Sequence, residues 1–253
     1  MGRWSARLAP LFIGFVGVKD GQRILDVGSG TGSLSRALLA SKKSIDVVGV
    51  DPVATYVLFA QKDILDPRVK FQVAAAEALP FSDDVFDAAL SLLVLQDFAE
   101  PKRAVAEMAR VTRFGGLVAA CQWDFRDGLP MLSLFWKAAE DVAPAAVAHY
   151  RARNSQWLKH DASLDDMAEI WVGSGLSEVR TAILQLSMKF SSFDDFWLPF
   201  LGGATPTSAF AAAINRETGG ILAKALYDTI ADVQPNGSFV LPARAWAVSG
   251  ITG

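Results

Sequence analysis

The chain has few of the side chains that most often carry redox or metal chemistry. Its 253 residues include one cysteine and two histidines, which excludes an internal disulfide framework and leaves no cluster of metal ligands. Charged residues make up only 20%, and the formal net charge is −3. Without a basic excess, the chain lacks the electrostatic footprint of nucleic-acid binding. We therefore expect neither a nucleic-acid partner nor a metal site.

The sequence also lacks a convincing membrane segment. Residues 8–18 are apolar and follow Arg3 and Arg7, but the run contains Pro10 and no small-residue cleavage site follows it. It is too short to span a bilayer, which takes about 20 residues. The lone Cys121 lies in an apolar run, which fits a buried thiol in a reducing compartment. We expect a cytoplasmic protein without an integral membrane segment.

What the sequence does contain is an alternation of apolar strands and amphipathic helices. This order predicts a parallel sheet with right-handed crossovers. Strands are predicted at residues 23–27, 45–50, 69–74, 88–95 and 117–123, and helices at 31–41, 52–63 and from residue 100 to Gly115-Gly116. Beyond Asp124 the pattern changes, with helices predicted at 131–142, 161–173, 191–200 and 208–230 and strands at 181–190 and 239–249.

A glycine turn at residues 24–32, ILDVGSGTG, is the organising motif of the first half. Because glycine has no Cβ atom, the chain can turn tightly here and a ligand can approach the backbone closely. The helix that follows directs its unpaired N–H groups toward that turn. The spacing differs from the dinucleotide fingerprint G-x-G-x-x-G, because Ser33 stands where the third glycine belongs.

Two acidic residues flank this turn and narrow the choice of ligand. Asp26 sits two residues before the first glycine, where it suits a positively charged cofactor better than a pyrophosphate. Asp51 ends the second apolar run, where a carboxylate can accept both ribose hydroxyls. At this point residues 23–124 resemble the class I S-adenosylmethionine-dependent methyltransferases, in particular the small-molecule, methyltransferase-11-like members. The segment 77–87, EALPFSDDVFD, closely resembles the loop that such enzymes place around adenine.

The resemblance implies a fold and a domain layout. The expected fold is α/β: a Rossmann-like, doubly wound, seven-stranded and mostly parallel sheet with an antiparallel last strand and helical insertions forming a cap. We expect one methyltransferase domain over residues 1–253, with a cap helix in 1–22 and the cofactor-binding core in 23–124. Insertions would fill 125–175 and 191–235, and the last strands 176–190 and 237–250.

S-adenosylmethionine is the expected cofactor. Related enzymes often carry an aspartate two residues before the glutamate of the adenine loop, but here that position is Ala75. Adenine recognition would then fall to the backbone at Ala76, to apolar contacts or to Glu77. The residues expected to bind the cofactor are Asp26, Gly28, Ser29, Gly30, Thr31, Asp51, Pro52, Ala76, Glu77 and Leu93.

No residue is marked out as catalytic. Gln96 follows the fourth strand and would either face the methyl group or cap the loop. His149, His160 and Tyr150 lie in the inserted region, and any of them would suit deprotonation of an acceptor hydroxyl, although a solvent-facing histidine is the commoner outcome. The many aromatic residues of the insertions favour a small apolar or aromatic methyl acceptor, unless they only fill a core.

Three other functions stay open at this stage. A non-catalytic protein that binds S-adenosylmethionine or S-adenosylhomocysteine is favoured by Ala75. An NAD-dependent oxidoreductase is disfavoured by the glycine spacing. A methyltransferase acting on a quinone-like lipid at a membrane is permitted by the mean hydropathy of +0.27. Residues 1–4 resemble the interior of a longer segment in related proteins, so either Met1 is an internal start or those sequences are longer. The oligomeric state is not encoded in any motif.

Overall fold

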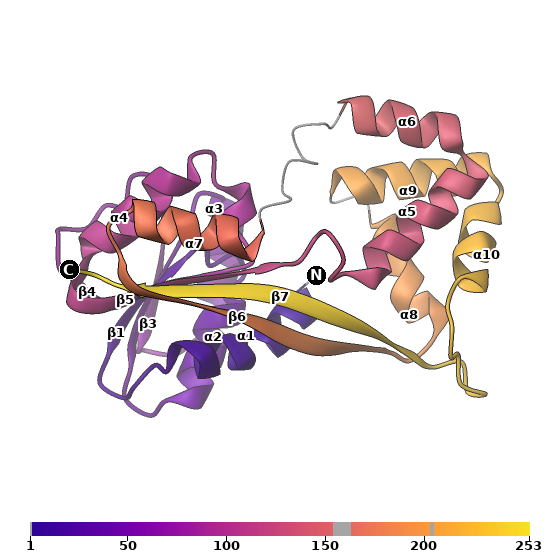
Figure 1. Ribbon diagram of the computed structural model, residues 1–253. Coiled ribbons are helices and arrows are strands. Elements are labelled where there is room, and N and C mark those ends of the chain that lie inside the picture. The colour runs from indigo at the N-terminus through magenta and orange to yellow at the C-terminus, as the bar shows by residue number, and fades with distance from the viewer. Residues whose placement is uncertain (1, 154–162, 203–204) are drawn as a thin grey trace. The chain divides into compact units, whose positions relative to one another are not determined.

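The computed structural model describes residues 2–153, 163–202 and 205–253 (Figure 1). The chain divides into two compact units. Unit 1 contains the described residues up to Trp123, residues 163–184 and residues 244–253. Unit 2 contains the described residues of 124–161 and of 185–243.

The sheet has seven strands in the order β3-β2-β1-β4-β5-β7-β6. β1 pairs in parallel with β2 and β4, β2 with β3, and β4 with β5. β7 runs antiparallel to β5. This confirms the predicted Rossmann-like, doubly wound fold with an antiparallel last strand. The strands are β1 Arg23–Val27, β2 Asp46–Asp51, β3 Val69–Val73, β4 Phe86–Leu92, β5 Thr112–Trp123, β6 Ser177–Phe190 and β7 Phe239–Ile251.

The strand order reverses between β1 and β4, so the carboxyl ends of these two strands flank a crevice where open α/β sheets bind their ligands. The centre of the sheet is buried, because the apolar runs of β1, β2 and β4 are covered on both faces. Helices α1 and α2 lie on one face and α4 and α7 on the other (Figure 1). The helices of unit 1 are α1 Gly2–Val16, α2 Ser33–Ser41, α3 Ala54–Asp63, the 3₁₀ turn η1 Leu95–Asp97, α4 Pro101–Val111 and α7 Leu164–Gly173.

Several element boundaries differ from the predicted ones. α2 begins at Ser33 rather than Thr31, because Gly32 holds a left-handed φ of 87°. α3 begins at Ala54, which leaves Pro52 outside the helix. β4 ends at Leu92 because Leu93 also has a positive φ, of 65°. β5 begins at Thr112, ahead of the glycine pair that was expected to precede it.

Helix α7 is part of the core of unit 1. Met167 and Trp171 are fully buried in the same cluster as Val105 and Met108 of α4. The indole Nε1 of Trp171 donates a hydrogen bond of 2.9 Å to the carbonyl of Val118 in β5. The helix therefore groups with the sheet, whereas the sequence pattern placed it with the inserted helices.

Unit 2 is mainly helical and is held together by aromatic side chains. Phe135 stacks on Phe200 with ring centroids 4.9 Å apart, and Phe196 lies within 5.7 Å of Phe190 and Phe239. α6 was not predicted, and the expected helix over 208–230 is broken by Gly219 and Gly220. The helices are α5 Pro130–Val142, α6 Pro144–Arg153, α8 Phe193–Trp197, the 3₁₀ helix η3 Leu198–Leu201, α9 Pro206–Glu217 and α10 Ile221–Asp228.

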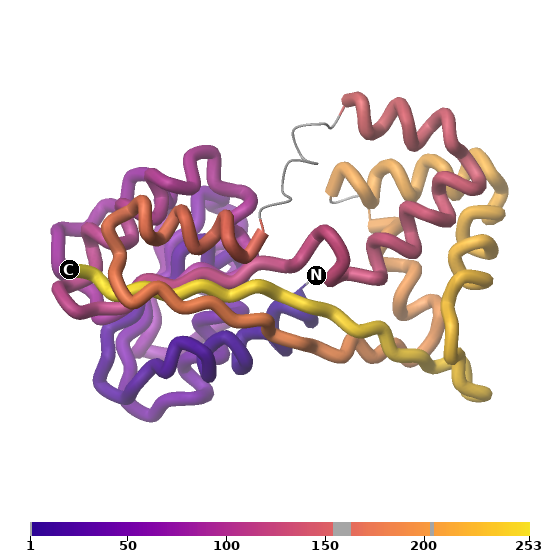
Figure 2. The backbone as a smooth tube through the Cα atoms, in the orientation of Figure 1, coloured from indigo at the N-terminus to yellow at the C-terminus, as the bar shows by residue number. Residues whose placement is uncertain are grey.

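The two long strands β6 and β7 run through both units. Figure 2 traces them side by side, and they are neighbours in the sheet. Residues 177–184 of β6 belong to unit 1 and its remainder to unit 2, while β7 changes unit between Ala243 and Arg244.

Candidate functional site

The glycine turn between β1 and α2 is tied to the end of β2. The backbone N–H groups of Gly28 and Ser29 both donate to the carbonyl of Val50, at 2.8 and 2.9 Å. Gly28 adopts a φ of 73°, and a Cβ at this position would collide with the side chain of Val94. Glycine is therefore required here by both conformation and space. At Gly30, by contrast, the place that a Cβ would take has nothing within 4 Å of it, so a ligand can approach the backbone there.

Asp51 is the carboxylate best placed to serve a ligand at this turn. It is 5% exposed and ends β2. Its Oδ2 accepts from the Gly30 N–H at 2.9 Å, and its Oδ1 accepts from the Val53 N–H at 2.8 Å. These two bonds fix the carboxylate plane. Each oxygen still has acceptor capacity, so the pair can receive the two hydroxyls of a ribose.

Asp26 is buried in the centre of the sheet, at 1% exposure. Its Oδ2 accepts from both the hydroxyl and the backbone N–H of Ser35, at 2.6 and 3.0 Å. Burial raises the pKa of the Asp26 carboxyl to about 6, and the hydrogen bonds from Ser35 oppose part of that rise. An acid in this setting favours a nearby cation, because a cation would offset the cost of burying its charge. Ser35 was not predicted, although it lies in the first turn of α2.

The loop between β3 and β4 is held in place from α4. Arg110 donates to the carbonyls of Leu79 and Phe81 at 3.1 and 2.9 Å and pairs with Glu107 and Asp83. Glu107 raises the pKa of the Arg110 guanidinium, so this cation is permanent. Sequence reasoning missed Arg110; its only signal is its spacing of three residues from Glu107 on one helix.

The adenine-loop candidates have different surroundings. Ala76 is buried at 5% exposure, whereas Ala75 is exposed. The Glu77 carboxylate accepts from the backbone N–H of Ala99 at 2.9 Å, which stabilises the approach to α4. Glu77 thus has a structural contact in addition to its predicted role. Pro52 and Thr31 are exposed on either side of Asp51 and the glycine turn.

The turn after β4 brings Leu93 and Gln96 together. Leu93 donates its N–H to the carbonyl of Cys121 at 2.7 Å, and its own carbonyl accepts from Gln96 Nε2 at 2.8 Å. Cys121 is buried, which raises the pKa of its thiol and keeps it protonated. All ten predicted cofactor residues, and Gln96, thus lie in unit 1. Asp26 is in β1 and Asp51 ends β2, and the others lie on the turns that follow β1, β2, β3 and β4.

Two other catalytic candidates, His149 and Tyr150, lie in unit 2. His149 is exposed on α6. Tyr150 is half-buried, its ring packs on Trp136 and Phe210, and its hydroxyl lies 3.2 Å from Thr207 Oγ1. His160 lies outside the described residues.

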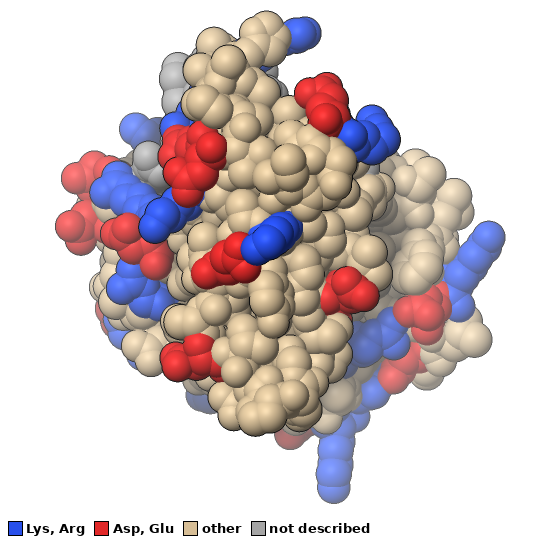
Figure 3. Space-filling view, turned by 90° about the vertical axis from the view of Figure 1, so that its right-hand side faces the viewer, with Lys and Arg blue, Asp and Glu red and all other residues tan. Residues whose placement is uncertain are grey.

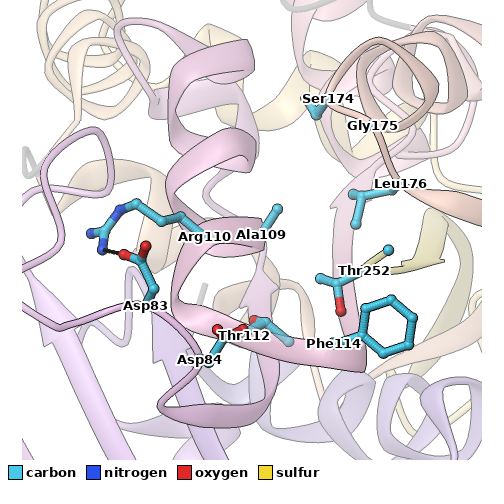
Figure 4. A pocket seen from close by; sticks show the side chains of 11 residues that line it. Asp83, Asp84, Ala109, Arg110, Thr112, Phe114, Ser174, Gly175, Leu176 and Thr252 are labelled. Carbon is cyan, nitrogen blue, oxygen red and sulfur yellow. Dashed lines mark hydrogen bonds and ion pairs between the residues drawn. The ribbon is translucent and has the colours of Figure 1, made fainter.

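A cavity of about 290 Å³ opens at the other end of the sheet (Figure 4). Asp83 and Asp84 precede β4 and Thr112 begins β5, so the cavity lies at the amino ends of these strands. It contains none of the predicted site residues. It is lined by Asp83, Asp84, Ala109, Arg110, Thr112, Phe114, Ser174, Gly175, Leu176, Thr252 and Gly253.

The surface in Figure 3 carries acidic and basic side chains intermixed, without a large area of one sign. Within the described ranges, no group of three or more histidine, cysteine, aspartate or glutamate residues is arranged to hold a metal ion. Across the same ranges, no helix combines the length and apolar character needed to cross a bilayer.

Comparison with known proteins identifies the family. The methyltransferase domain family matches residues 25–120. The demethylmenaquinone methyltransferase of Renibacterium salmoninarum is 33% identical over 181 residues, which are 69% of this chain and 75% of that protein. The chain belongs to the class I S-adenosylmethionine-dependent methyltransferases, and S-adenosylmethionine is its cosubstrate.

Further comparisons give one more relative by sequence and one by fold. The demethylmenaquinone methyltransferase of Clavibacter sepedonicus is 38% identical over 132 residues, 50% of this chain and 51% of that protein. The chain thus spans only about half the length of some curated relatives. Phosphoethanolamine N-methyltransferase 2 of Haemonchus contortus, solved with S-adenosylmethionine, superposes with a TM-score of 0.60 at 17% identity, over 97% of this chain and 52% of that one.

Proposed function

We propose that this protein transfers the methyl group of S-adenosylmethionine to a small apolar acceptor with an aromatic, quinone-like ring. The observation that carries the proposal is the fixed Asp51 carboxylate beside the open backbone of Gly30. The cofactor would be held by Asp26, Gly28, Ser29, Gly30, Thr31, Asp51, Pro52, Ala76, Glu77 and Leu93.

Each of these groups has a distinct task in the proposal. Asp51 binds the ribose hydroxyls, and the ionised Asp26 provides negative potential for a cationic ligand. Ala76 offers backbone groups to adenine in place of the side chain that Ala75 lacks. When bound, the sulfonium supplies an electrophilic methyl group. The protein then has to align the acceptor and exclude water, and alignment alone can supply roughly 7–11 kcal/mol.

The choice of acceptor is supported by the relatives. Two of them carry the name demethylmenaquinone methyltransferase. The aromatic side chains of unit 2 support it less strongly, because they pack on one another and form that unit's own core. We place the reaction in the cytoplasm, because the single cysteine is a free, buried thiol of the kind that a reducing compartment preserves.

The proton acceptor, where one is needed, is a separate question. Gln96 is an amide and cannot take a proton from a hydroxyl at neutral pH. His149 and Tyr150 remain the candidates for that step, whereas a carbon nucleophile on an activated ring requires no strong base at the moment of transfer. Acceptor methylation assayed with His149→Asn and Tyr150→Phe would distinguish these cases.

The cofactor site is tested by calorimetric titration with S-adenosylmethionine, S-adenosylhomocysteine and NAD. The native protein should bind the two sulfur nucleosides and not NAD. Asp51→Asn should weaken their binding tenfold or more, because it removes a charged acceptor worth roughly 1.5–3 kcal/mol. Asp46→Asn is the matched control, since Asp46 begins the same strand and its exposed carboxylate pairs with Arg23.

Binding and turnover must then be separated. Transfer of a labelled methyl group to any compound in a panel of naphthoquinols and phenols would establish that the protein is an enzyme. Tight binding of S-adenosylhomocysteine without transfer to any compound of the panel or of a cell extract would favour the non-catalytic alternative. Binding of NAD in place of the sulfur nucleosides would refute the proposal as a whole.

A further inference from the structure

The turn after β4 holds a leucine in a conformation that leucine rarely adopts. Leu93 has a φ of 65°, in the left-handed region, where a bulky side chain is an outlier. Two hydrogen bonds hold it there: its N–H donates to the Cys121 carbonyl, and its carbonyl accepts from Gln96 Nε2. Strained residues that the surroundings fix in this way concentrate at ligand sites.

The amide of Gln96 is oriented by its neighbours. Its Nε2 donates to the Leu93 carbonyl at 2.8 Å and to Asp97 Oδ2 at 3.1 Å, so both of its N–H groups are used. The reverse orientation would set Oε1 against two acceptor oxygens and is excluded. The remaining atom, Oε1, is shielded from solvent and has no hydrogen-bond partner among the described residues. A buried acceptor left unpaired in this way needs a donor that the described residues do not supply.

The surroundings of Gln96 indicate which partner. Oε1 can only accept, so the partner must present an N–H or O–H group. The Asp97 carboxylate on the same amide makes the local potential negative, which favours a cationic donor. The turn also adjoins the glycine turn, because the Val94 side chain fills the space that a Cβ on Gly28 would need. Asp26, the other acid of this region, has its Oδ2 occupied by two hydrogen bonds from Ser35.

We propose that Gln96 Oε1 accepts a hydrogen bond from the ammonium group of the bound methyl donor. Gln96 is then a binding residue that fixes the amino-acid end of S-adenosylmethionine. This rests on the proposed function, because it assumes that the cofactor occupies the crevice between β1 and β4.

The test compares two ligands that differ only in the ammonium group. The purified full chain is titrated with S-adenosylhomocysteine and with its deamino analogue. The native protein should bind S-adenosylhomocysteine more tightly. Gln96→Met keeps the length of the side chain but has no amide. It should weaken the binding of S-adenosylhomocysteine about tenfold and leave the binding of the deamino analogue unchanged. Gln61→Met is the control: Gln61 Nε2 also donates to a backbone carbonyl, that of Phe71, at 2.8 Å.

The other outcomes are equally informative. An equal loss for both ligands would overturn the inference and show that Gln96 only shapes the turn through Leu93. Unchanged binding of both ligands would overturn it as well. If the native protein binds neither ligand, the proposed function itself fails. Gln96→Asn, which withdraws the oxygen by one methylene, serves as a second variant should Gln96→Met fail to fold.

Discussion

Asp26 shows how a single buried acid can link cofactor chemistry to stability. It lies in the centre of β1, and its only described neighbours that donate hydrogen bonds to it are the two groups of Ser35. Because desolvation raises its pKa in the folded state, ionising it opposes folding. The protein tolerates this cost at the position where a cationic ligand is expected.

This cost should be visible as a pH dependence. The folded-state pKa of Asp26, about 6, lies above the ordinary aspartate value of 3.8, so the folded protein binds the proton more strongly than the unfolded chain. The stabilisation is full below pH 3.8 and is lost as the pH rises through about 6. Lowering the pH from about 7.5 to about 5 should therefore stabilise the native protein by roughly 1–1.5 kcal/mol relative to Asp26→Asn.

The measurement is urea unfolding of both proteins at the two pH values. Taking the difference between the proteins removes the contribution of the other carboxylates. A difference that is the same at both pH values would show that Asp26 titrates normally.

At the scale of single residues, the sequence predicted which residues lie near the glycine turn better than it predicted the contacts that they make. Asp51 was predicted from its place after the second apolar run, since an acid at the end of a strand is by itself a weak signal. The structure places its carboxylate against the Gly30 N–H, and ribose binding stays a prediction. The contact of Glu77 with the Ala99 N–H could not be predicted, because it depends on how the loop meets α4. The left-handed φ of Leu93 has no sequence signal at all, since leucine is among the residues least suited to it.

At the scale of elements, helix α4 acts as a clamp on the loop before β4. Its Arg110 binds the carbonyls of Leu79 and Phe81 and the carboxylates of Glu107 and Asp83. The loop carries no regular structure of its own, so its shape depends on these bonds. The affinity of any ligand that contacts the loop therefore depends indirectly on α4.

Replacing Arg110 with methionine should loosen that loop. We expect a loss of about 1–2 kcal/mol in the free energy of unfolding, because the guanidinium is one third exposed and solvent screens part of its interactions. Binding of S-adenosylhomocysteine should weaken several-fold, since the loop would have to be ordered on binding. Arg113→Met is the control, because the Arg113 side chain is 59% exposed and pairs with Asp87 rather than with the loop. Equal effects of the two variants on affinity would contradict a clamp role.

Element types were easier to predict than element limits. The alternation of apolar runs and amphipathic helices correctly predicted β1 to β5, because the strands at the centre of the sheet are buried on both faces. α6 was missed because only Val147 of its residues is buried, so it shows almost no amphipathic period. The helix expected over 208–230 is two helices, since Gly220 takes a φ of 88°.

At the scale of the whole molecule, the site candidates divide between the two units. All predicted cofactor residues belong to unit 1, and the aromatic core belongs to unit 2. The overall fold could be predicted because the family motifs lie in residues 23–124. The division into units could not, because it depends on packing among residues far apart in the sequence.

This division predicts that damage to unit 2 spares cofactor binding. Phe196→Leu removes ring contacts to Phe190 and Phe239 from a side chain that is 1% exposed. We expect a loss of roughly 1–3 kcal/mol in stability and an unchanged dissociation constant for S-adenosylhomocysteine. Calorimetric unfolding and titration of the same samples test both. A parallel loss of affinity would show that unit 2 contributes to the cofactor site.

The strand order has a consequence for synthesis of the chain. β5 pairs with β7, and β7 begins only at Phe239, after all the helices of unit 2 have been made. At about 5–20 residues per second, β5 leaves the ribosome several seconds before its partner exists. During that time its apolar edge, which includes Val118 and Ala120, is an open template for pairing with other chains. Slow translation should therefore increase aggregation of the nascent protein, and a chaperone that covers strand edges should prevent it.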